Sequence, residues 1–99
     1  MSHYDKEGNV VDIMTYIGLS SDFKYKQIGR NHIDDTLVST IWVGSEFTRF
    51  ETMVLGGEHN LYCEKWKTEE EAQAGHLKIC KMVFGDDFSI DQGKEDGWT

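Results

Sequence analysis

Two neighbouring runs of β-branched and aromatic residues constrain the fold of this chain more than any other feature. The first covers residues 36–43, and the second covers residues 47–55, where Gly56-Gly57 ends it. Such residues favour extended strands, and the short connection Gly44-Ser45-Glu46 favours an antiparallel hairpin. Both faces of each strand carry apolar side chains, so we expect the hairpin to lie centrally in a sheet.

The sequence Thr68-Glu69-Glu70-Glu71 is typical of a helix N-terminus. The Thr68 hydroxyl can accept a hydrogen bond from the Glu71 backbone N–H, while the Glu71 carboxylate reaches back toward the cap. The three acids also complement the positive end of the helix dipole. We expect this helix to end at about Val83 or Phe84. Its apolar stripe, which should face the sheet, consists of Ala72, His76, Ile79, Cys80 and Val83.

Shorter elements are predicted in the first third of the chain. Residues 4–11 place turn formers between β-prone flanks, which indicates a small ribbon. Asp12 can cap a short helix beginning at Ile13, which Gly18 and the polar run 20–22 should end. Residues 25–33 carry basic side chains at alternate positions, a pattern typical of an edge strand.

These elements, with a further short strand at residues 61–66, define an α+β fold. We expect a small antiparallel sheet of three to five strands, with a C-terminal helix packed on one face and a short N-terminal helix. The length of 99 residues suits one domain, which we assign to residues 1–84. Residues 85–99 contain five acidic residues against one lysine, so we expect an acidic, flexible C-terminal tail.

The chain is acidic, with 18 Asp and Glu against 10 Lys and Arg and a net charge of -8. This charge opposes nonspecific binding to nucleic acid or to anionic membranes. A membrane span or secretory signal is not recognisable, so we expect a cytoplasmic protein. In that reducing compartment Cys63 and Cys80 should be free thiols.

Four segments of the chain together resemble a family of small uncharacterised proteins encoded by tailed bacteriophages and prophages. The segments are residues 4–9, residues 38–44, residues 50–54, and residues 68–72 with Ala74-Gly75-His76. The resemblance implies a phage accessory protein in the cytoplasm of an infected or lysogenic bacterial cell. It implies no established activity, cofactor or catalytic residue. The chain departs from the family between Gly44 and Phe50, where relatives carry a longer polar loop.

Four residues have spacing reminiscent of a zinc site. His59 and Cys63 form one pair, and His76 and Cys80 form another, one helical turn apart. The mixed order of His and Cys and the sufficient apolar content favour two core cysteines and no metal. We therefore expect no cofactor.

His76 is the most informative single residue, because it lies within an apolar helical stripe. A buried imidazole needs a hydrogen-bond partner, and Thr40, Thr52 or Glu51 of the hairpin could provide one. The same residues could instead line a small pocket. We combine the residues of both interpretations with two residues of the acidic surface. The candidate binding residues are then His76, Trp42, Thr40, Glu51, Thr52, Glu69 and Glu70.

Sequence signatures of catalysis are missing, including phosphate-binding loops, dinucleotide fingerprints and nucleophile elbows. Two hypotheses for function remain alongside an unsupported enzymatic one. In the first, the protein binds a host or phage protein, and inhibition of a bacterial defence system is one form of this hypothesis. In the second, it binds or sequesters a small nucleotide-like metabolite near the hairpin and His76.

Overall fold

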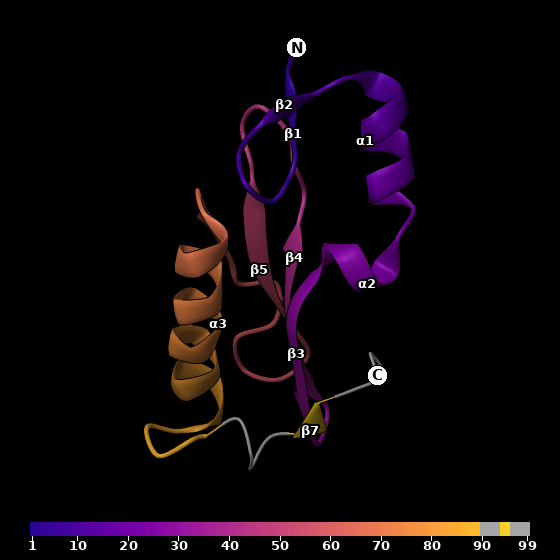
Figure 1. The fold of residues 1–99 in the computed structure, drawn as a ribbon. Helices are drawn as coiled ribbons and strands as arrows, with labels where there is room; N and C mark the ends of the chain where they lie inside the picture. Colours follow the sequence, from indigo (N-terminus) through magenta and orange to yellow (C-terminus); the bar gives the residue numbers. More distant parts are fainter. Residues whose placement is uncertain (90–93, 96–99) are drawn as a thin grey trace.

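The fold consists of one curved antiparallel sheet, a two-stranded ribbon and three helices (Figure 1). The computed structural model describes residues 1–89 and 94–95. The strands are β1 (His3–Tyr4), β2 (Val10–Val11), β3 (Gln27–Ile33), β4 (Thr36–Trp42), β5 (Phe50–Leu55), β6 (Cys63–Trp66) and β7 (Lys94–Glu95). The helices are α1 (Ile13–Ser20), α2 (Phe23–Lys26) and α3 (Glu69–Phe84). The α+β class, the C-terminal helix on the sheet and the short N-terminal helix are confirmed.

The predicted hairpin forms the centre of the sheet, but its second strand begins at Phe50 and not at residue 47. Residues 43–49 therefore form a longer connection than the expected turn at Gly44-Ser45-Glu46. The strand order is β6-β5-β4-β3-β7, with β4 in the middle and all neighbours antiparallel. The β4–β5 register runs from Leu37 opposite Leu55 to Trp42 opposite Phe50. Strands β3 and β4 are joined by a tight turn at Asp34-Asp35, where Asp34 has a φ of 53°, a conformation that Asp tolerates.

Helix α3 begins as its sequence predicts. The Thr68 hydroxyl accepts a hydrogen bond from the Glu71 backbone N–H at 3.1 Å. The Glu71 carboxylate accepts from the backbone N–H of Lys67 at 3.0 Å, one residue before the expected position at Thr68. The helix ends at Phe84, as predicted, and Gly85 follows with a φ of 121° that suits glycine.

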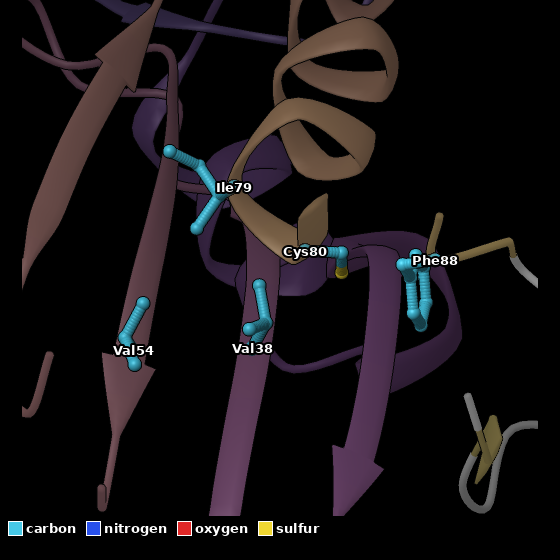
Figure 2. Close-up of a cluster of buried hydrophobic side chains, with 5 residues drawn as sticks. All are labelled: Val38, Val54, Ile79, Cys80 and Phe88. Carbon is cyan, nitrogen blue, oxygen red and sulfur yellow. The ribbon is translucent and has the colours of Figure 1, made fainter. Parts of the chain in front are cut away.

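Two apolar clusters lie between α3 and the sheet. Figure 2 shows the first, in which Val38 and Val54 of the sheet face Ile79 and Cys80 of α3, with Phe88 beside them. The second contains Trp42, Phe50 and Ala72, and residues of α1 and α2 pack against it. Because Phe88 is buried, the core extends past the domain boundary expected at residue 84. The remainder of the expected tail falls largely outside the described residues.

The prediction of an edge strand over residues 25–33 was wrong at its beginning and in its position. Residues 23–26 form α2, because the Asp22 carboxylate caps the turn by accepting from the Tyr25 backbone N–H at 3.1 Å. The ring of Tyr25 then packs edge-on against Trp42, with ring centres 5.1 Å apart. Strand β3 starts only at Gln27, and it lies between β4 and the short strand β7. A long-range aromatic contact thus outweighs the local alternation of charge.

Helix α1 ends at Ser20, the first residue of the polar run that we expected to end it together with Gly18, so Gly18 itself lies within the helix. Glycine weakens a helix interior without preventing it. Among the described residues, none of the helices has both the length and the apolar composition required to cross a bilayer.

Glycine allows α3 to approach the sheet closely. A Cβ atom at Gly75 would overlap the indole ring of Trp66, and one at Gly29 would lie 2.8 Å from the His76 ring. Real side-chain atoms do not approach so closely, so these two positions fix the distance between helix and sheet.

We predict that Gly75→Ala lowers the free energy of unfolding by about 1–3 kcal/mol, because α3 must shift to relieve the overlap. The matched control is Gly18→Ala in α1, where an added Cβ meets no atom within 4 Å. That substitution should stabilise the protein by up to about 1 kcal/mol through helix propensity. Urea unfolding followed by circular dichroism measures both effects. Equal effects of the two variants would contradict the close approach at Gly75.

Candidate functional site

A chain of hydrogen-bonded polar side chains crosses the interface between α3 and the sheet. His76 of α3 lies 2.7 Å through Nδ1 from the Thr40 hydroxyl and 2.8 Å through Nε2 from Oδ1 of Asn31. The Thr40 hydroxyl lies 2.5 Å from the Thr52 hydroxyl, which accepts from the Trp66 indole N–H at 2.9 Å. These contacts join β3, β4, β5 and β6 to the helix.

The partners of His76 determine its tautomer. Oδ1 of Asn31 can only accept, so Nε2 of His76 carries the proton and donates to it. Nδ1 of a neutral imidazole is then an acceptor, and the Thr40 hydroxyl donates to it. The Thr52 hydroxyl in turn donates to Thr40. Each hydrogen bond in this network therefore has a defined donor and acceptor, and the donors point in one direction from Trp66 to Asn31.

Burial keeps the cluster uncharged. His76 is 5% exposed, and burial lowers its pKa from 6.5 to about 4. Burial also raises the pKa of the neighbouring Cys80 thiol to about 12, so the thiolate is absent at neutral pH. Sγ of Cys80 lies 3.6 Å from Nε2 of His76. A low-pKa imidazole beside a protonated thiol positions the helix and does not form an activated nucleophile.

The amide nitrogen of Asn31 differs from the other polar groups of the cluster, because it has no hydrogen-bond partner among the described residues. The Asn31 side chain is fully buried, so this unpaired donor opposes folding by on the order of 1–3 kcal/mol.

Of the candidate binding residues, the structure brings together His76, Thr40 and Thr52. Both ring nitrogens of His76 are occupied, so a ligand there would have to displace existing hydrogen bonds. Trp42 is fully buried elsewhere, where its indole N–H donates to the Tyr4 carbonyl at 3.0 Å. Alternation along β5 turns Glu51 to the opposite face of the sheet from Thr52.

The acidic candidates Glu69 and Glu70 lie in the first turn of α3, away from the His76 cluster. The four cysteine and histidine candidates for zinc are also divided. Cys80 and His76 are buried neighbours, whereas His59 lies in the β5–β6 connection. Cys63 is exposed on β6, so the expectation that both cysteines belong to the core was wrong for Cys63. Within the described ranges, no group of three or more His, Cys, Asp or Glu side chains is arranged to hold a metal ion.

Sequence reasoning did not foresee a second feature, the exposure of apolar side chains on α1. Two of its residues attach the helix to the core: the Tyr16 hydroxyl donates to the Val43 carbonyl at 2.9 Å, and Leu19 packs near Trp42. The residues on the other side point to solvent. Ile13 is 53% exposed, Met14 is 74% exposed and Ile17 is 50% exposed. We call these three residues the α1 outer face.

The composition of α1 contains the signal for this face. The helix has no charged residue, and its apolar and aromatic side chains are Ile13, Met14, Tyr16, Ile17 and Leu19. A helix with so many apolar side chains normally buries most of them. Here no residue of α1 is buried, and the adjacent side chains of Val10 and Phe23 are 67% and 73% exposed.

Comparison with known proteins adds no family or relative to this description. No protein-family model, curated protein or solved structure matches the chain.

We predict that stability falls as the pH is lowered from 6.5 toward 4. The pKa of His76 is lower in the folded protein, so the unfolded chain binds the proton first as the pH falls. Proton binding stabilises the unfolded chain relative to the folded protein in this window. The difference of pKa corresponds to a loss of about 3 kcal/mol, complete near pH 4. Urea unfolding at a series of pH values measures it.

The His76→Gln variant provides the control, because its side chain does not titrate. It should be less stable at neutral pH but nearly insensitive to pH between 6.5 and 5. The lowered carboxyl pKa values of Asp12 and Glu64 act only nearer their ordinary values of 3.8 and 4.5. An unchanged slope in His76→Gln would show that another group is responsible.

Proposed function

We propose that this protein acts by binding another protein through the α1 outer face. The observation that carries the proposal is the exposure of Ile13, Met14 and Ile17 on a helix without charges. Isolated apolar side chains on a surface need no explanation, but three on one helical face form a patch. Val10 and Phe23, which precede and follow α1 in the sequence, are exposed as well. Patches of this kind mark protein interaction sites.

The helical spacing of the patch indicates how a partner would be recognised. Residues i, i+1 and i+4 lie on one side of a helix, as in amphipathic helices that bind an apolar groove of their partner. Tyr16 and Leu19 fix the inner side of α1, so the helix is already ordered before binding. Such preorganisation reduces the conformational entropy lost on association.

The charge of the protein indicates the rim of the partner's groove. Asp12 and Asp22 are exposed at the two ends of α1, and the whole chain carries a net charge of -8. A groove bordered by Lys or Arg would complement these charges and would associate faster at low salt. The proposed partner is therefore a protein with an apolar, basic-rimmed groove.

The resemblance to phage and prophage proteins suggests where such a partner is found. We propose a host or phage protein in the cytoplasm of the infected or lysogenic bacterial cell. Components of bacterial defence systems belong to this group, and occupying the surface of one would suffice to inhibit it. A binding protein needs no catalytic residue, which agrees with the uncharged His76 cluster.

The test compares the double variant Met14→Ser/Ile17→Ser with Leu61→Ser/Met82→Ser. The control removes two apolar side chains that are 66% and 40% exposed on other elements. Both variants should fold normally. Each variant is used to retain proteins from bacterial extract, and quantitative mass spectrometry measures the amount of each retained protein. We expect the wild type and the control to retain the same proteins, and the α1 variant to retain about tenfold less of them.

Two results would contradict the proposal. One is retention of the same proteins by the wild type and the α1 variant. The other is a wild-type dimer in sedimentation experiments that the α1 substitutions dissociate, because the patch would then serve self-association.

A separate prediction concerns the acidic surface. The neutral substitutions Glu69→Gln, Glu70→Gln, Asp86→Asn and Asp87→Asn should lower the association rate with the recovered partner several-fold at low salt. The dissociation rate should change little, because these residues lie outside the α1 outer face. Glu71 is retained because its carboxylate caps α3. Surface plasmon resonance measures both rates, and an unchanged association rate would exclude electrostatic steering.

A further inference from the structure

A pocket opens at the end of the sheet where two connections meet. It has a volume of about 510 Å³. One wall comes from the β4–β5 connection, and the other comes from the end of β6 and the start of α3. The lining residues are Glu46, Phe47, Arg49, Lys65, Trp66, Lys67 and Thr68. No residue of α1 lines the pocket, and Trp66 is the one lining residue that also belongs to the hydrogen-bonded network of His76.

Three of these residues are cations in a chain dominated by acids. Arg49, Lys65 and Lys67 have no ion pair with any carboxylate of the described part of the chain. By contrast, Lys78 is paired with Glu64 at 3.1 Å. Glu51 stands opposite Lys65 in the β5–β6 register, yet no ion pair joins these described side chains. Three unpaired cations around one hollow produce a local positive potential.

Packing holds the cationic groups in place. The Arg49 guanidinium lies over the Tyr4 ring, 3.6 Å from its centre, in a stacked cation–π arrangement. Its N–H edges remain available to hydrogen-bond a planar or tetrahedral anion. The pairing of Phe50 with Trp66 places the neighbouring Arg49 and Lys67 at corresponding ends of their strands.

One carboxylate, that of Glu46, also lines the pocket and keeps its negative charge. The Glu46 carboxylate accepts a hydrogen bond from the Ser2 backbone N–H at 3.0 Å. The cap of α3 is complete, with Thr68 bonded to Glu71 and the Lys67 backbone N–H bonded to the Glu71 carboxylate. The three cations outnumber this one carboxylate, so the lining favours an anionic ligand.

An aromatic side chain at the rim extends this chemistry. Phe47 is 78% exposed and lines the pocket beside the three cations. Its ring offers a face for an aromatic group of the ligand, whereas the Trp66 indole is held inside by Gly75 and Thr52. Pockets of 300–1,000 Å³ are typical of small-molecule sites.

We infer that this pocket binds a small organic phosphate that carries an aromatic ring, of the size of a mononucleotide. The phosphate contacts Arg49, Lys65 and Lys67, and the ring stacks on Phe47. Binding here is separate from protein binding by α1, so each function can fail without the other.

Isothermal titration calorimetry with the four ribonucleoside monophosphates tests the inference. We expect at least one to bind, and the corresponding nucleoside and inorganic phosphate to bind about tenfold or more weakly, because each lacks one of the two contacts. The Lys65→Gln/Lys67→Gln variant should weaken nucleotide binding by about tenfold or more. Phe47→Ser should weaken it while leaving inorganic phosphate unaffected.

The matched control is Lys24→Gln/Lys81→Gln, which removes the same charge from two exposed lysines outside the pocket. It should bind nucleotide as the wild type does, as should Met14→Ser/Ile17→Ser. The inference is overturned if no monophosphate binds at millimolar concentration. It is equally overturned if nucleoside and nucleotide bind alike, or if the control weakens binding as much as the pocket variant.

Discussion

The contact between His76 and the sheet is the interaction on which the rest of the structure depends. Its two ring nitrogens bond to Thr40 and Asn31, which lie on adjacent strands, so a sliding helix would break both bonds. Gly29 beneath the imidazole and Gly75 against Trp66 set how closely α3 approaches. Apolar packing supplies most of the attraction between the layers, while these directional bonds specify one arrangement.

This arrangement separates the interior from the surfaces available for function. The polar groups between α3 and the sheet largely satisfy one another, and burial keeps His76 and Cys80 uncharged at neutral pH. Chemistry with a ligand or partner is therefore more readily assigned to groups outside that interface. Among the described residues, no element covers the α1 outer face, and the pocket beside β6 gathers three cations against one carboxylate, that of Glu46. An ordinary protein surface has scattered apolar side chains and mixed charges, whereas α1 exposes a group of apolar side chains and the pocket gathers cations.

The sequence located part of these sites and missed the rest for physical reasons. It identified His76 as a buried histidine and offered Thr40, Thr52 or Glu51 as partners or as the lining of a pocket. The structure joins His76 to Thr40 and, through Thr40, to Thr52, while strand alternation turns Glu51 to the other face of the sheet. The sequence could not point to Asn31, which belongs to a strand 45 residues away and bonds to His76 only after folding. Arg49, Lys65 and Lys67 likewise come from separate segments, and each alone is an ordinary surface residue. The α1 outer face was visible as an uncharged apolar helix, but exposure depends on which side the fold covers.

Local sequence was sufficient for the hairpin, the capping of α3 and its apolar stripe, because each depends on residues within a few positions of one another. Strand β3 was different. Its beginning depends on a turn capped by Asp22 and on the packing of Tyr25 against Trp42, which is 17 positions along the chain. The same holds for the burial of Phe88 and for the pocket. Periodicity records which faces are apolar, whereas long-range packing establishes which of those faces are covered and which remain open.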